Sequence, residues 1–151
     1  MKRRNFTSLS LVAIAIICLT WPAQTLAAGA TLGFETQALD LDTGTITEQF
    51  PDLLDGTEGA DVLIGYHADR IPHAVLMPVG EGVTLAVMSN TSYDSVTAAD
   101  VAGLSFSAGV IDQPLEASDT VVVKTDAGAT FKLGNVFEDE AGVTFNYEQL
   151  Q

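Results

Sequence analysis

Cysteine, tryptophan and basic residues are scarce in this chain of 151 residues, which has one cysteine, one tryptophan, six lysines and arginines, and 20 acidic residues. Cys18, Trp21 and three of the basic residues lie within the first 27 positions. The residues beyond that point therefore exclude disulfides, thiolate catalysis and thiolate metal sites. Burial of apolar groups must hold this part of the chain together.

The N-terminal segment has the parts of a secretory signal peptide in the expected order. Basic residues at positions 2–4 precede an apolar run over residues 9–19, and Pro22 separates that run from the small residues Ala27 and Ala28. This order is typical of an exported protein, and the run is only about half of the ~20 residues that a membrane-spanning helix needs. We therefore expect cleavage after residue 27 or 28.

The position of Cys18 argues against a lipid anchor. Ile17 precedes it, whereas a lipidation site needs a small residue directly before its cysteine. We expect a signal peptide over residues 1–27 and a single domain over residues 28–151, which is the usual size of one domain. The mature protein is then secreted or periplasmic, with no stable membrane anchor after cleavage.

Acidic residues dominate the charge of the predicted mature chain. All 20 lie beyond position 27, where only Arg70, Lys124 and Lys132 are basic, so the net charge there is −17. Such a chain repels phosphate backbones and anionic membranes at long range, which excludes nucleic-acid binding. The scattered acids favour a solvated surface, and cation binding is the alternative because carboxylates are the natural ligands of hard cations.

Short apolar, β-branched or aromatic runs between turn signals predict an all-β fold. About eight such strands indicate an antiparallel sandwich or barrel. The predicted strands cover residues 39–42, 61–66, 73–77, 83–88, 104–111, 120–125, 129–137 and 143–150.

The last three of these runs predict a C-terminal antiparallel meander. Strict alternation over residues 143–147 should place Val143, Phe145 and Tyr147 on one face, with Thr144 on the other. A single short helix is expected at residues 97–100, where the threonine and aspartate can cap each other. Residues 46–59 read as a loop.

Two segments resemble calcium-binding motifs, but neither is complete. Residues 56–65 are similar to one turn of the calcium-binding β-roll of secreted toxins and proteases, although Thr57 replaces a glycine and Arg70 stands where the next turn needs aspartate. Residues 40–44 resemble the start of an EF-hand loop, but Gly44 replaces an oxygen ligand and Pro51 replaces the bidentate glutamate. We therefore expect no calcium-specific effect, although a site would draw on Asp40, Asp42, Asp55, Glu58 and Asp61.

The two histidines are the clearest candidate ligands for a transition metal or haem. His67 and His73 lie six residues apart with Asp69 between them, and the turn at Pro72 could fold them together. The simpler interpretation is two partly exposed polar residues at the ends of neighbouring strands.

No residue pattern predicts catalysis. The chain has no G-x-S-x-G segment, and the serines of residues 103–109 lie on a strand pattern rather than at a nucleophile elbow. Twenty acidic residues also form many pairs without a motif for glycoside hydrolysis.

Residues 121–128, 131–133 and 142–147 resemble segments of known secreted β proteins. They look like the C-terminal meander of many small secreted bacterial β proteins without assigned activity. They are also similar, more distantly, to the end of HmuY-type haemophores. The likeness covers about thirty residues and implies a fold. HmuY-type proteins bind haem through two histidines, but neither His67 nor His73 can be placed on those positions.

The leading interpretation is an exported, non-catalytic β domain without a cofactor, which binds an extracytoplasmic ligand or protein or has a structural role at the cell exterior. The second is a carrier of haem or a divalent cation at His67, Asp69 and His73. The third is a secreted hydrolase.

Maturation can be measured directly. The small residues at positions 27 and 28 predict that the exported protein begins between Ala28 and Thr31, so its intact mass should match one of those chains. Recovery of a full-length, membrane-embedded form would contradict this expectation.

Overall fold

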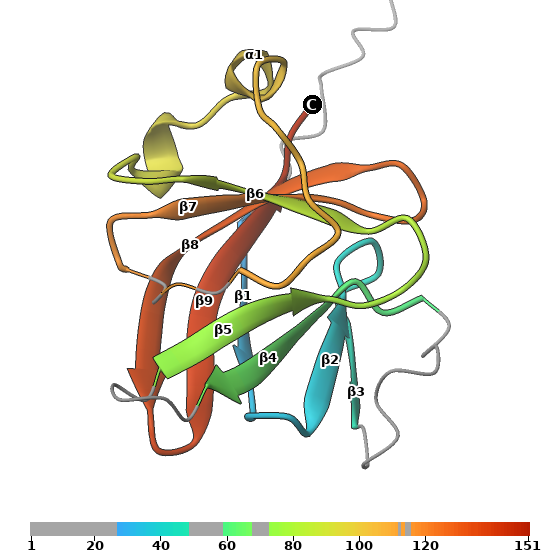
Figure 1. Cartoon of the computed structure of the whole chain (residues 1–151), viewed down its shortest axis with the longest axis vertical. Helices are drawn as coiled ribbons and strands as arrows, with labels where there is room; N and C mark the ends of the chain where they lie inside the picture. Colours follow the sequence, from blue (N-terminus) through green and yellow to red (C-terminus); the bar gives the residue numbers. More distant parts are fainter. Residues whose placement is uncertain (1–26, 49–58, 68–72, 112, 114–115) are drawn as a thin grey trace, which may run out of the picture.

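A computed structural model describes residues 27–48, 59–67, 73–111, 113 and 116–151. Two antiparallel sheets make up this part of the chain (Figure 1). The larger sheet has the order β1-β9-β8-β7-β6 and the smaller has the order β3-β2-β4-β5. The strands are β1 (Ala28–Leu32), β2 (Gln37–Asp40), β3 (Thr45–Glu48), β4 (Val62–His67), β5 (His73–Pro78), β6 (Thr84–Met88), β7 (Thr120–Lys124), β8 (Thr130–Asp139) and β9 (Gly142–Gln149).

The helical content of the described residues is small. It consists of the 3-10 turn η1 (Tyr93–Ser95) and the single-turn helix α1 (Ala98–Val101). The capping predicted from the sequence is present, since the Thr97 amide donates to Asp100 Oδ2 at 2.9 Å. None of these helices has the length and hydrophobicity of a membrane span. The all-β fold with one short connecting helix is thus confirmed.

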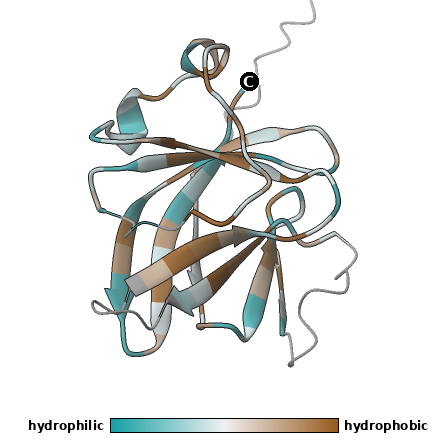
Figure 2. Ribbon diagram, viewed as in Figure 1, coloured by the Kyte–Doolittle hydropathy of each residue, from teal (hydrophilic) through white to brown (hydrophobic). Residues whose placement is uncertain are grey.

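One hydrophobic core lies between the two sheets. Its buried residues come from strands of both, for example Leu39 and Ile64 from the smaller sheet and Val123 and Phe145 from the larger. Figure 2 shows hydrophobic stretches along β4, β5 and β7. Because successive side chains of a strand point to opposite faces, alternating sequences supply this core.

The predicted C-terminal antiparallel meander is confirmed. β7 pairs with β8, and β8 pairs with β9, both antiparallel. Val143 and Phe145 are buried and Tyr147 packs against the core, as the alternation predicts. A bulge between Gly134 and Phe137 interrupts the second pairing.

The segment predicted as a strand over residues 104–111 is not one. It makes only two isolated bridges, Ser107 with Leu85 of β6 and Ile111 with Leu76 of β5. β6 and β5 are edge strands of different sheets, so the segment crosses from one sheet edge to the other and forms a continuous ladder with neither. It thereby covers part of two edges that would otherwise expose unpaired backbone groups.

Two strands were not predicted. β1 begins at Ala28, beside the expected cleavage site, and pairs with β9. β3 overlaps the start of residues 46–59, which the sequence predicted as a loop, and all four of its residues are exposed. A strand with no buried face gives no alternating pattern, which is why composition alone misses it. The rest of that predicted loop, residues 49–58, is outside the described residues.

Substitution of Phe145 tests the core. Phe145→Ala should lower the free energy of unfolding by about 3–5 kcal/mol, because the ring is buried and its removal leaves a cavity. Thr144→Ala is the matched control on the opposite face. It should cost at most about 1 kcal/mol, since Thr144 is only half-buried and loses one hydroxyl contact with Thr31. Equal costs in chemical denaturation would contradict the assigned faces.

Candidate functional site

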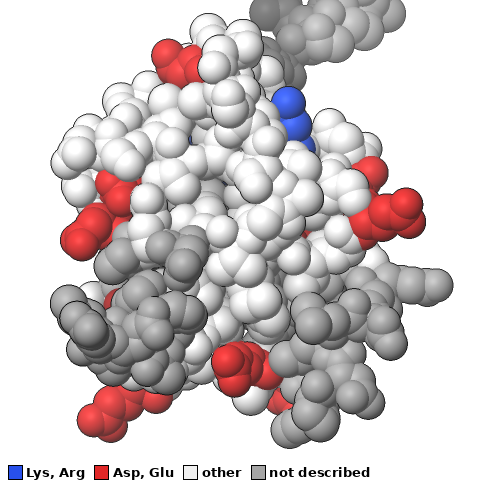
Figure 3. Space-filling model, viewed as in Figure 1, with Lys and Arg blue, Asp and Glu red and all other residues white. Residues whose placement is uncertain are grey.

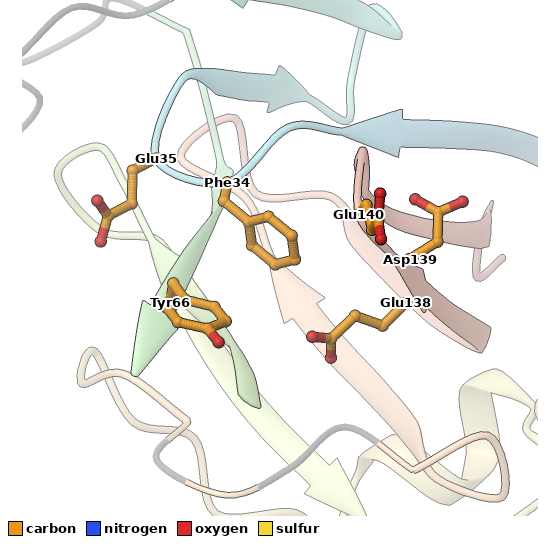
Figure 4. Close-up of a pocket in the computed structure, with 6 residues that line it drawn as sticks. All are labelled: Phe34, Glu35, Tyr66, Glu138, Asp139 and Glu140. Atoms are coloured by element: carbon orange, nitrogen blue, oxygen red, sulfur yellow. The ribbon is translucent and has the colours of Figure 1, made fainter. Parts of the chain in front are cut away.

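An open pocket of about 790 Å³ lies where three parts of the chain meet. These parts are the β1–β2 turn, the end of β4, and the end of β8 with the turn that follows it (Figure 4). Two aromatic and four acidic side chains line it: Phe34, Glu35, Tyr66, Glu138, Asp139 and Glu140.

The β1–β2 turn positions the aromatic part of the lining. The Glu35 amide donates to the Ile64 carbonyl at 2.8 Å, and this bond fastens the turn to β4. Glu35 has a left-handed backbone, with φ of 53°. As a result, the ring of Phe34 meets the ring of Tyr66 edge to face, with centroids 5.4 Å apart. Tyr66 remains 43% exposed, so its ring is accessible from the pocket.

The end of β8 and the β8–β9 turn position the acidic side chains of the lining. Glu138 Oε2 accepts a hydrogen bond from the Ala74 amide at 3.3 Å, and Asp139 Oδ1 accepts one from the Ala141 amide at 2.8 Å. Gly142 has φ of 147°, and a side chain there would collide with the backbone of Leu32. A glycine is therefore required for the turn to approach β1 this closely.

The pocket combines negative charge with aromatic surface. Four of its six lining residues are acidic, and none of the described lining residues is basic. Figure 3 shows far more acidic than basic side chains on the face of the molecule that it presents. Aromatic faces attract cations, and neighbouring carboxylates add to that attraction. The arrangement thus favours a ligand with positive charge and an apolar or planar part.

The histidines predicted as ligands occupy paired backbone positions. His67 ends β4, His73 begins β5, and the two are partners in the β4–β5 ladder. Asp69 lies outside the described residues. A haem or metal site at His67, Asp69 and His73 therefore stays a prediction.

A second group of acids comes together at the opposite end of β2 and β4. One carboxylate oxygen each from Asp40, Asp42 and Asp61 lies within 4.8 Å of the others. The first two belong to the EF-hand-like segment and the third to the β-roll-like segment, so the fold unites two incomplete motifs. Asp55 and Glu58, the other acids on which a calcium site was expected to draw, lie outside the described residues.

Asp61 is the exceptional member of this group. Its exposed fraction is 0%, and its Oδ2 accepts a hydrogen bond from the Leu41 amide at 2.8 Å. Burial raises the pKa of this carboxyl to about 6, with the charges of Asp42, Asp126 and Asp40 adding to the rise. The Leu41 hydrogen bond acts in the opposite direction.

Comparisons with known proteins return no match. No family model, no curated protein and no solved structure is similar to this chain. The geometry of the two acidic sites is therefore the basis for any functional conclusion, and the pocket is the site that sequence reasoning missed.

The raised pKa of Asp61 predicts a pH dependence of stability in chelator-treated protein. Because folded Asp61 binds its proton more tightly than the unfolded chain does, its contribution to stability is greatest below pH ~3.8 and is lost as the pH rises to about 6. A shift of about two units corresponds to roughly 3 kcal/mol.

Asp61→Asn isolates this contribution, since the amide oxygen can still accept from Leu41. Relative to the parent chain, the variant should gain roughly 2–4 kcal/mol in unfolding free energy between pH 4 and pH 7. Urea denaturation at a series of pH values measures the difference. A difference that does not change with pH would show that Asp61 titrates normally.

Proposed function

We propose that this chain is an exported, non-catalytic β domain that binds a protein or peptide partner through an arginine side chain held in the Phe34–Tyr66 pocket. The observation that carries the proposal is the lining, in which two neighbouring aromatic rings share one open pocket with four carboxylates. The predicted signal peptide supports a location outside the cytoplasm, in the periplasm or beyond the cell.

Arginine fits the two kinds of lining group together. Its guanidinium is planar and stacks on aromatic faces, and its N–H donors match carboxylate geometry. In the pocket, Tyr66 offers a ring, and Glu140 and Glu35 stand on opposite sides of the aromatic pair (Figure 4). A lysine ammonium would meet the same charge but has no planar face to stack.

The charge of the whole molecule supports the same class of partner. A predicted mature net charge of −17 attracts basic partners at long range and accelerates their association. The pocket then supplies the local contacts. Because solvent-exposed charges are screened by salt, binding of this type weakens as ionic strength rises.

Titration with a small probe tests the proposal. A blocked tri-arginine peptide should bind in calorimetry at low salt, while the neutral tri-citrulline peptide should not. Tyr66→Ala should weaken binding about fivefold or more, since a cation–π contact contributes on the order of 1 kcal/mol. Glu140→Gln should weaken it as well, because the substitution removes a carboxylate from the lining.

Matched controls separate the pocket from general electrostatics. Phe137 is 64% exposed and is not part of the lining, so Phe137→Ala should leave binding unchanged. Glu81→Gln removes one exposed charge elsewhere. Equal weakening by Glu81→Gln and Glu140→Gln would reduce the interaction to nonspecific attraction and overturn the proposal. Binding of a neutral oligosaccharide in place of tri-arginine would favour the hydrolase or a sugar-binding module.

A further inference from the structure

The pairing of β2 with β4 brings like charges face to face. Ala38 pairs with Leu63 and Leu39 with Val62, so the next position of the antiparallel register sets Asp40 opposite Asp61. Asp42 adds a third carboxylate, with one oxygen of each side chain inside 4.8 Å. Like charges directly opposite each other across strands are destabilising. Three ionised carboxylates at this point therefore repel one another, and a cation bound among them would offset that repulsion.

The buried member of the group has an oxygen without a partner. The Asp61 amide donates to Leu39 O at 2.9 Å, its carbonyl accepts from Val79 N at 2.8 Å, and its Oδ2 accepts from Leu41 N at 2.8 Å. Its Oδ1 is buried and has no hydrogen-bond partner. An unsatisfied buried oxygen is costly, and the cost is larger for a charged group. The unpartnered Oδ1 of Asp61 is a second observation, separate from the proximity of the three carboxylates. This oxygen is available to bind a cation.

The other two carboxylates of the cluster, those of Asp40 and Asp42, differ in how firmly they are held and in their exposure to water. Asp40 is held rigidly, because Thr43 donates to it through both its amide, at 3.0 Å, and its hydroxyl, at 2.7 Å. Asp42 is exposed on the same turn, which leaves one side of the cluster open to water. The cluster thus joins one buried, one fixed and one solvent-facing carboxylate.

Neither described lysine supplies the missing charge. Lys132 Nζ lies 3.2 Å from Glu148 and also donates to the Val96 carbonyl. Lys124 Nζ lies 3.9 Å from the centroid of the Phe106 ring. Among the residues that the structure describes, no basic side chain is therefore committed to the cluster, and a cation from solution can neutralise the ionised carboxylates.

Contrary to the expectation from the two incomplete sequence motifs, we propose that Asp40, Asp42 and Asp61 bind a calcium ion that fastens the β2–β3 turn to the start of β4. Oxygen ligands from carboxylates suit a hard cation, and water can complete the shell on the Asp42 side. Calcium tolerates irregular coordination at 2.3–2.6 Å, whereas magnesium demands near-ideal octahedral geometry. With only three protein side chains as ligands, the affinity belongs to the weak class of extracellular modules, on the order of 10⁻⁴–10⁻³ M.

This site is separate from the pocket of the proposed function. The pocket adjoins the start of β2 and the end of β4, while the carboxylate cluster adjoins the end of β2 and the start of β4. Failure of one proposal consequently leaves the other intact.

Melting curves of the mature protein in chlorides at equal ionic strength are the first test. After removal of metal with a chelator, about 5 mM calcium should raise the melting temperature by roughly 4–8 °C above sodium, and magnesium by about 1 °C or less. Asp61→Asn and Asp42→Asn should each abolish most of the calcium-specific rise. Asp94→Asn removes the same charge from an exposed position elsewhere and should retain the full rise.

Backbone amide resonances of the unmodified protein locate the ion. The amides of Leu41 and Thr43, which donate to Asp61 and Asp40, should shift together with one dissociation constant as calcium is added. The Ala141 amide, which donates to Asp139 of the pocket, should stay in place. Asp42 lies on the surface, so Asp42→Asn is expected to fold. This variant and the spectra of the parent chain test the calcium site even if Asp61→Asn fails to fold.

Three outcomes would contradict the proposal of a calcium site. They are equal melting shifts in all three salts, a calcium response that survives both substitutions, or shifts at Ala141 without shifts at Leu41 and Thr43.

Discussion

Burial of apolar side chains between two antiparallel sheets is the interaction on which the rest of this structure depends. The described residues contain no cysteine, so no disulfide holds the sheets together there. The core between the sheets accordingly consists of apolar residues such as Leu32, Val62 and Val123. Polar groups that could recognise a ligand are displaced to the ends of strands and to the turns, and both acidic sites lie there.

Asp61 is the exception that connects the core with one of these sites. It directly precedes β4 and is as inaccessible as the core residues Leu39 and Val62. Through its backbone and carboxylate it binds Leu39 of β2, Leu41 directly after β2, and Val79 directly after β5. An amide at this position could make the same Leu41 contact without a buried charge. A carboxylate is a better choice only if a cation or a proton accompanies it, which is the physical reason to regard the cluster as a site.

Much of the architecture could be predicted from sequence because it follows from local pattern. Alternation in residues 143–147 predicts the faces of β9, and the capping pair Thr97 and Asp100 predicts α1. Prediction failed where the deciding contacts are remote. β3 has no buried face, and residues 104–111, although rich in apolar residues, make only isolated bridges to the edges of β5 and β6 instead of forming a strand. Periodicity cannot distinguish these cases, since it contains no information about the partner of a segment.

The two acidic sites also could not be predicted from local sequence pattern, because their residues come from distant parts of the sequence. Net charge predicts attraction for cations in general, but it cannot tell an organic cation from a metal ion. Three carboxylates with oxygens within 4.8 Å of one another, one of which also has a buried, unsatisfied oxygen, suit a small hard ion, whereas carboxylates beside the exposed ring of Tyr66 suit a planar organic group. Asp40 and Asp61 are 21 positions apart in sequence, and Phe34 and Glu138 are far more distant. Each calcium-like motif is incomplete when its residues are considered alone, because the acids that lie together in the fold come from segments that are distant in sequence.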